Sequence, residues 1–117
     1  MKEQSKKDST YNSGRIINVI STAGIWGNFG QAAYASAKSG LIGLTRVSAL
    51  DLQRSGITCN AIAPFASTRV TESIIPQNEA QKKYKKSALK IEAKYVGDLT
   101  AFLVSNHGKK YSGQLFG

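Results

Sequence analysis

Two apolar runs on either side of a long helical pattern constrain the fold of this chain most. Residues 15–20 are almost uninterrupted in isoleucine and valine. A β-branched run of this length predicts a strand that is buried on both faces, as in a parallel sheet. Residues 57–63 predict a second strand, which Pro64 ends. The small, glycine-rich stretch of residues 21–30 is expected to be a loop at the C-terminal end of the first strand.

Residues 31–55, between the two runs, are expected to form one helix. Small residues come first in it, and larger apolar side chains then spread around the helix: Leu41, Ile42, Leu44, Val47, Leu50 and Leu52. A helix that is apolar on more than one face must be covered on more than one face. One cover is the sheet, and the other is expected to be another helix, such as one from a second subunit. Gly56 is expected to supply the C-terminal cap.

The rest of the chain continues an alternation of helices and strands. Residues 65–91 are polar and rich in lysine, with Pro76 among them, and so long a stretch predicts a mobile lid or binding loop. Residues 95–106 show the helix period, and residues 111–116 predict a third strand. The order strand, helix, strand, loop, helix, strand predicts an α/β fold with a parallel sheet. Three strands are few for such a sheet, so the sheet is expected to be incomplete.

Composition narrows the classes of protein further. The formal charge is +9, and most of it comes from lysines near the start of the chain and between residues 82 and 94. These lysines form either a solvated surface or a site for phosphate-bearing ligands, such as a nucleotide or coenzyme A, or for nucleic acid. Few aromatic residues lie among the lysines, which disfavours base stacking, so no nucleic acid is expected. The only cysteine, Cys59, excludes a disulfide framework or zinc site and favours a reducing compartment. The expected location is the cytoplasm, with the peroxisome or another organelle as open alternatives. No apolar run approaches the ~20 residues of a membrane span, so no membrane is expected as a partner. No metal is expected either.

Three residues could carry chemistry at the C-terminal ends of the strands, where sheets of this class bind ligands. Ser21 leaves the first strand, and Tyr34 lies near the start of the following helix. Lys38 is four residues further on and shares the helical face of Tyr34. A nearby ammonium favours the phenolate form of a tyrosine, which could then exchange a proton with a substrate oxygen. The Ser21 hydroxyl could hold the same oxygen from the other side.

This arrangement resembles the short-chain dehydrogenase/reductase family. The matching sequence is GRIINVISTAGIWGNFGQAAYASAKSGLIGLTRVSALDL, followed by GITCNAIAP. The C-terminal segment from residue 95 resembles the family's last helix and last strand. The NFGQ loop and the text IAPFASTRVTE are similar to the hydroxyacyl-CoA dehydrogenase domain of multifunctional β-oxidation proteins. The sequence departs from the family after Pro64, where Phe65 replaces a glycine and Arg69 takes the place of a threonine. The resemblance implies the C-terminal part of a Rossmann-like, doubly wound parallel sheet.

The resemblance also implies a mechanism and a set of site residues. Tyr34 is implied as the general acid/base, Ser21 as the group that orients the substrate oxygen, and Lys38 as the ligand of the nicotinamide ribose. Hydride would pass between the substrate carbon and NAD or NADP. Residues expected to contact this cofactor are Tyr34, Lys38, Pro64, Ser67 and Thr68. The implied substrate is a secondary alcohol or a ketone, and 3-hydroxyacyl and 3-oxoacyl thioesters such as an acyl-CoA are favoured. The expected assembly is a homo-oligomer that forms through residues 31–55.

The domain organisation follows from the same comparison. Residues 1–13 are expected to be a polar N-terminal segment, and residues 14–117 the C-terminal half of the oxidoreductase domain, with residues 65–94 as its substrate loop. The glycine-rich dinucleotide fingerprint of the family has no counterpart in this amino-acid sequence. The chain is therefore expected to be a fragment of a longer protein. Two alternatives stay open: a non-catalytic, basic interaction fragment, and a 3-oxoacyl-carrier-protein reductase.

Overall fold

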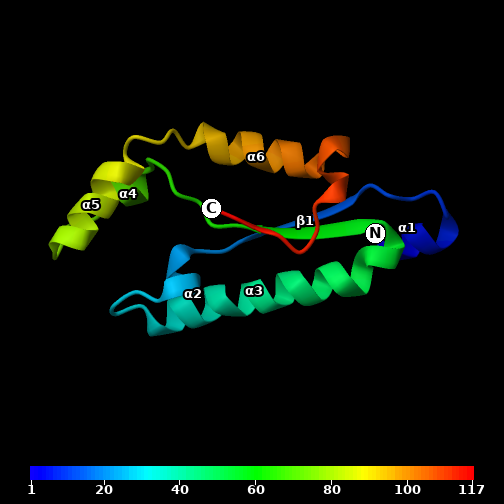
Figure 1. Cartoon of the computed structure of the whole chain (residues 1–117), viewed down its shortest axis with the longest axis horizontal. Helices are drawn as coiled ribbons and strands as arrows, with labels where there is room; N and C mark the ends of the chain where they lie inside the picture. The colour runs from blue at the N-terminus through cyan, green and yellow to red at the C-terminus, as the bar shows by residue number, and fades with distance from the viewer. The chain divides into compact units, whose positions relative to one another are not determined.

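The chain folds into two compact units. The computed structural model describes residues 1–117, apart from the side chain of Val70. One unit contains Met1–Pro64 and Ala101–Gly117, and the other contains Phe65–Thr100. Figure 1 shows the elements of both units in chain order.

The first unit is built on a parallel sheet of three strands. These strands are β1 (Gly14–Val19), β2 (Ile57–Ile62) and β3 (Leu115–Phe116), in the order β1-β2-β3. Gly14 pairs with Ile57 and Val19 with Ile62, while Ala61 pairs with Leu115. The predicted α/β fold with a parallel sheet of about three strands is therefore confirmed.

The burial of β1 differs from the prediction. All six residues of β2 are buried, whereas only Gly14 is buried in β1 and Val19 is 53% exposed. β1 lies at the edge of this sheet, so only β2 has a neighbouring strand on each side. The prediction that the first strand is buried on both faces is wrong, because a β-branched run shows strand propensity but not how many neighbours the strand has.

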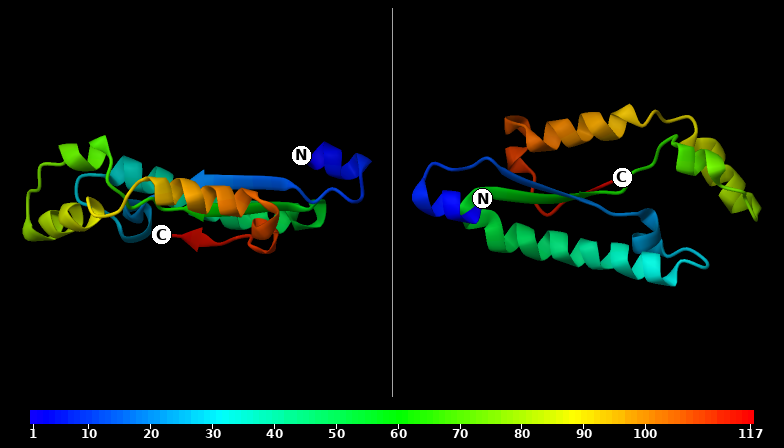
Figure 2. Two further views of the ribbon diagram at one scale, coloured as in Figure 1. Left: turned by 90° about the horizontal axis from the view of Figure 1, so that it is seen from above. Right: turned by 180° about the vertical axis from the view of Figure 1, so that it is seen from behind.

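Helix α3 (Ala32–Leu52) runs along one side of the sheet, as the views from above and behind show (Figure 2). It is followed by the short 3₁₀ helix η1 (Gln53–Ser55) and ends at Gly56, whose φ of 65° gives the predicted left-handed cap. A Cβ atom at Gly56 would also collide with the carbonyl oxygen of Tyr11. The buried core between helix and sheet contains Ile20, Ala61 and Ala63, against which Leu41, Ile42 and Leu115 pack.

A second face of α3 stays open in this chain. Leu44, Val47 and Leu50 are 53%, 55% and 73% exposed. The predicted cover by another helix is therefore not supplied within the described residues. Exposed apolar side chains in a row on one helix are typical of a surface that meets a partner.

The segment that leads into β3 is held by a buried asparagine of β2. Asn60 is fully buried, its side-chain amide donates to the carbonyl oxygen of Tyr111 at 2.9 Å, and its side-chain oxygen accepts from the backbone N–H of Gln114 at 3.1 Å. Helix α6 (Lys94–Val104) and the 3₁₀ helix η2 (Asn106–Lys110) precede this segment. These two hydrogen bonds of Asn60 hold the turn that brings β3 beside β2.

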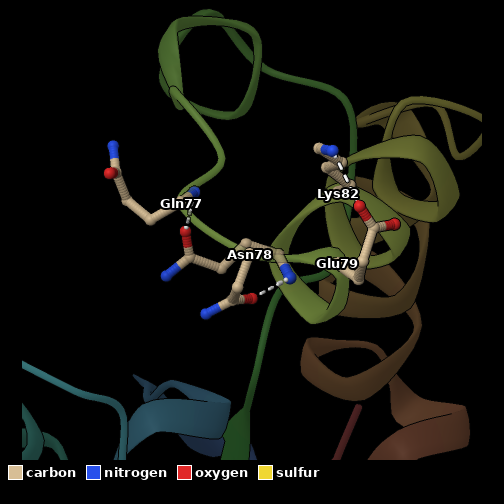
Figure 3. A network of polar contacts seen from close by, with 5 residues as sticks. Gln77, Asn78, Glu79 and Lys82 are labelled. Carbon is tan, nitrogen blue, oxygen red and sulfur yellow. Dashed lines mark hydrogen bonds and ion pairs between the residues drawn. The ribbon is translucent and has the colours of Figure 1, made fainter.

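The second unit consists of short helices. Within the predicted substrate loop lie α4 (Arg69–Ser73) and α5 (Glu79–Ala88), and Phe65 packs edge-to-face on Tyr84 at a centroid distance of 5.0 Å. Figure 3 shows the start of α5, where the side chain of Asn78 accepts a hydrogen bond from the backbone N–H of Gln81. The N-terminal residues contain one further helix, α1 (Lys2–Lys7). Among the described residues, no helix is long and apolar enough to cross a membrane.

Candidate active site

Ser21 occupies the end of β1 and begins a helix that the sequence did not predict. Helix α2 (Thr22–Trp26) starts at Ser21, whose hydroxyl oxygen accepts a hydrogen bond from the backbone N–H of Ala23 at 3.2 Å. The expectation that residues 21–30 form only a loop is therefore wrong. A serine at the N-cap satisfies one of the free N–H groups of the first turn, which favours a helix despite its glycine.

Helix α2 lies directly against the start of α3, and Gly24 permits the contact. A Cβ atom at Gly24 would come within 2.8 Å of the backbone carbon and the Cβ of Lys38, and of the backbone nitrogen of Ser39. Real Cβ atoms do not approach backbone atoms so closely, so only glycine fits at this position. The element that begins with Ser21 therefore rests on the residues that carry Lys38.

The side chain of Lys38 is fixed by the strand. Its ammonium donates a hydrogen bond to the backbone carbonyl oxygen of Val19, the last residue of β1, at 2.8 Å. The same nitrogen lies 5.7 Å from the centroid of the Tyr34 ring. Tyr34 is 47% exposed, and no hydrogen bond occupies its hydroxyl among the described residues. An ammonium has three N–H donors, and the bond to Val19 uses only one of them.

Proximity of a lysine to a tyrosine does not by itself mark a site in this chain. The ammonium groups of Lys94 and Lys110 lie 5.3 Å from the ring centroids of Tyr95 and Tyr111, respectively. The Tyr34–Lys38 pair differs because its ammonium is held by a backbone oxygen at the C-terminal end of a parallel strand. This end of the sheet is where α/β folds of this kind bind ligands.

The structure brings together some predicted site residues and leaves others apart. Tyr34 and Lys38 lie on consecutive turns of α3, as the spacing predicted. Ser21 shares the end of β1 with the anchored ammonium, and the two helices that carry these residues pack against each other at Gly24. Pro64 follows β2 and is exposed, in the same unit.

Ser67 and Thr68 belong to the second unit and have local structural contacts. The backbone N–H of Ser67 donates to the carbonyl oxygen of Ile91 at 2.7 Å. The Thr68 hydroxyl caps α4 by accepting from the backbone N–H of Thr71 at 3.2 Å. Their role as cofactor ligands stays a prediction.

Two features of the site were missed by sequence reasoning. The carbonyl oxygen of Val19 carries no sequence signal, because every residue has one. Gly24 did carry a signal, since a glycine inside a helix costs stability unless a close approach requires it. That signal was hidden while the stretch was expected to be a loop.

Known proteins match most of this chain. The family described as enoyl-(acyl carrier protein) reductase matches residues 1–116. The peroxisomal hydratase-dehydrogenase-epimerase of Saccharomyces cerevisiae is 41% identical over 102 residues, which are 87% of this chain and 11% of that protein. The peroxisomal multifunctional enzyme type 2 of Mus musculus is 42% identical over 92 residues, or 79% of this chain and 11% of that protein. A 3-oxoacyl-(acyl-carrier-protein) reductase of Rickettsia typhi is 37% identical over 118 residues, 97% of this chain and 48% of that protein. The chain thus spans about a tenth of the two peroxisomal relatives and about half of the reductase.

Proposed function

Because the chain belongs to the short-chain dehydrogenase/reductase family, we propose that it is part of an NAD- or NADP-dependent oxidoreductase that interconverts a secondary alcohol and a ketone. The observation that carries the proposal is the ammonium of Lys38, held 2.8 Å from the carbonyl oxygen of Val19 and 5.7 Å from the Tyr34 ring centroid. This arrangement keeps a positive charge beside a half-exposed phenol at the ligand-binding end of the sheet.

Each site residue has a role in this reaction. In the direction of reduction, Tyr34 gives its proton to the carbonyl oxygen of the substrate, and in the direction of oxidation it takes the proton from the alcohol. The Ser21 hydroxyl donates a hydrogen bond to the same oxygen and orients it. A nicotinamide cofactor, when bound, supplies or accepts the hydride at the substrate carbon.

The residues present fit such a cofactor. Lys38 keeps two N–H donors beyond its bond to Val19, and together with the Tyr34 hydroxyl they suit the hydroxyl groups of a ribose. Pro64, Ser67 and Thr68 follow β2 in the chain and are assigned to the carboxamide side of the nicotinamide. NAD and NADP are both compatible with this set, because none of these residues would meet the adenosine ribose that distinguishes them.

The proposed substrates are 3-hydroxyacyl and 3-oxoacyl thioesters. The names of the relatives support this class, since they include a 3-oxoacyl reductase and a hydratase-dehydrogenase-epimerase. The test uses the longer protein that is predicted to contain this chain. It supplies a 3-oxoacyl thioester with NADH or NADPH, or a 3-hydroxyacyl thioester with NAD⁺ or NADP⁺, and follows the absorbance of the reduced cofactor. A change in this absorbance that depends on the thioester is expected. If neither 3-oxoacyl nor 3-hydroxyacyl thioesters cause cofactor turnover, the proposal is wrong.

The lysines of α5 support coenzyme A as the thioester carrier. Lys82 and Lys94 pair with Glu79 and Glu92, and Lys85 donates to the carbonyl oxygens of Glu72 and Ile74. Among the described residues, the ammonium groups of Lys83, Lys86 and Lys90 have no such partner.

Lys83 and Lys86 lie on one side of α5, and Lys90 follows the helix just beyond its C-terminal end. Their spacing of three and four residues places them opposite Gln81, Lys85 and Ala88, which are partly or fully buried. Coenzyme A carries a diphosphate and a further 3′-phosphate, whereas a phosphopantetheine on a carrier protein has a single phosphate. Several cations in a row therefore complement coenzyme A better.

Replacing Lys83, Lys86 and Lys90 together with alanine should weaken the binding of coenzyme A about tenfold, since exposed ion pairs each contribute a modest amount. Isothermal titration calorimetry with coenzyme A measures this directly, and rising salt should weaken wild-type binding. The matched control replaces Lys2, Lys6 and Lys7 of α1, which removes the same charge elsewhere and should leave affinity unchanged. Equal losses in both triple variants would show attraction by net charge alone and would reject the site.

We assign the open face of α3 to contact with a second copy of the chain. Leu44, Val47 and Leu50 form an apolar surface that the described residues leave exposed. Leu50→Lys puts a charge at the most exposed of the three, and a buried charge without a partner is costly at an interface. Sedimentation velocity should show a shift from dimer to monomer in this variant. A wild-type protein that sediments as a monomer at all concentrations would contradict the assignment.

The proposed location is a reducing compartment, either the cytoplasm or the peroxisome. Cys59 is the only cysteine and is free and buried, so the fold does not depend on an oxidising environment. The two peroxisomal relatives support the organelle by their names. Imaging of the fluorescently tagged protein with a peroxisomal marker distinguishes the two locations, and secretion would contradict both.

A further inference from the structure

A buried threonine of α3 makes a polar contact with the sheet. Thr45 is fully buried, and its hydroxyl donates to the carbonyl oxygen of Leu41 at 2.7 Å. The same hydroxyl oxygen accepts a hydrogen bond from the side-chain amide of Asn18 in β1, at 2.9 Å. A hydrogen bond depends on both distance and angle, so it adds a directional restraint to the apolar packing of the helix. This contact therefore fixes how far α3 slides along β1.

The amide of Asn18 is itself held in one orientation. Its nitrogen also lies 3.7 Å from the sulfur of Cys59 on the neighbouring strand, within reach of its second hydrogen. Cys59 is fully buried, and burial raises the pKa of its thiol, so the sulfur stays neutral. With both hydrogens directed, the amide presents a single geometry to Thr45.

The contact is connected to the candidate active site through the rigid helix. Thr45 lies seven residues after Lys38, which is two turns further on the same face of α3. Asn18 directly precedes Val19, whose carbonyl oxygen accepts from the Lys38 ammonium at 2.8 Å. The same two elements are thus joined at two points, one at the site and one deeper in the interface.

We infer that Asn18 and Thr45 are positioning residues, whose hydrogen bond sets the register of α3 on β1 and thereby holds the Lys38 ammonium at the end of the strand. They touch neither substrate nor cofactor and act only through Lys38. The inference rests on the proposed function for its importance, but the placement of Lys38 can be measured without any turnover.

The test follows the reactivity of individual lysines in the full chain. In wild-type protein, an amine-reactive reagent is applied under native conditions, and the labelling rate of each lysine is read by mass spectrometry. Thr45→Val keeps the shape and removes the hydroxyl, so Lys38 should label about fivefold faster, a change of the size that one hydrogen bond allows. Thr45→Ser keeps the hydroxyl and should restore the wild-type rate. Lys83 and Lys86 are internal standards and should not change.

A matched variant separates positioning from a general loss of stability. Asn60→Ala removes a buried polar side chain whose hydrogen bonds go to Tyr111 and Gln114 and not to α3, so it should destabilise the fold without a selective change at Lys38. The inference is overturned if Thr45→Val leaves the Lys38 rate unchanged, if Thr45→Ser behaves like Thr45→Val, or if Asn60→Ala accelerates Lys38 equally. If the longer protein is inactive while the labelling pattern is as expected, the proposed function is rejected and the positioning role is kept.

Discussion

Tyr34→Phe, made in the longer protein that is predicted to contain this chain, is expected to lower the turnover of a 3-oxoacyl thioester by about a thousandfold, because general acid/base catalysis contributes on the order of 10²–10⁴ to a rate. The change removes only the phenolic oxygen and keeps the ring. The Lys38 ammonium is anchored at 2.8 Å by the carbonyl oxygen of Val19 and stays in place for the ribose, so the affinity for the nicotinamide cofactor should fall by no more than the one hydrogen bond of the Tyr34 hydroxyl, about fivefold. Steady-state rates and a separate titration of the cofactor measure the two effects.

The chain provides a close control for this prediction. Tyr95 is 54% exposed and has the ammonium of Lys94 5.3 Å from its ring centroid, much like the pair at the candidate site. Tyr95→Phe therefore makes the same chemical change beside the same kind of cation, but in the other compact unit. It should leave the rate within about twofold of the wild type, as surface substitutions usually do. A Tyr34→Phe variant that keeps its rate would remove the proposed acid/base role.

The sequence predicted the elements that depend on local pattern. The helix period placed Tyr34 and Lys38 on one face of α3, and Gly56 marked the end of that helix because its φ of 65° requires a glycine. The two strands of the parallel pair were likewise found within about one residue of their bounds, as strong apolar runs allow.

The sequence could not predict the contacts that depend on neighbours in space. The anchor of Lys38 is a backbone carbonyl of a strand nineteen residues away, and no residue type signals it. The edge position of β1 is also a tertiary property, since only β2 pairs on both sides. The pair of Asn18 and Thr45 is separated by 27 positions, and its polar residues break the apolar pattern without indicating which residue they meet.

Helix α2 was not predicted, and for that reason the requirement for a glycine at position 24 was not recognised. Read as a loop, the segment makes Gly24 one of several interchangeable glycines. As part of a helix, Gly24 is the residue that lets α2 reach the backbone of α3 at Lys38. The structure therefore shows a steric reason for a glycine at position 24, and this reason can be tested.

Gly24→Ala should destabilise the fold by about 2 kcal/mol, although alanine is the better helix former by about 1 kcal/mol. The steric effect wins because the new Cβ would lie 2.8 Å from the backbone carbon of Lys38 and the backbone nitrogen of Ser39, which cannot rotate away. Helix α2 must then move, which separates Ser21 from the anchored ammonium and should also lower turnover. Urea unfolding measures the stability difference.

Gly97→Ala in α6 is the matched control for that change, because a Cβ there meets nothing within 4 Å. With no clash, only the helix propensity acts, and this variant should be more stable than the wild type by about 0.5–1 kcal/mol. The two glycine substitutions are thus expected to have opposite signs. If Gly24→Ala also raises stability, α2 does not press against α3 at Lys38, and the steric link between Ser21 and the Tyr34–Lys38 pair is lost with it.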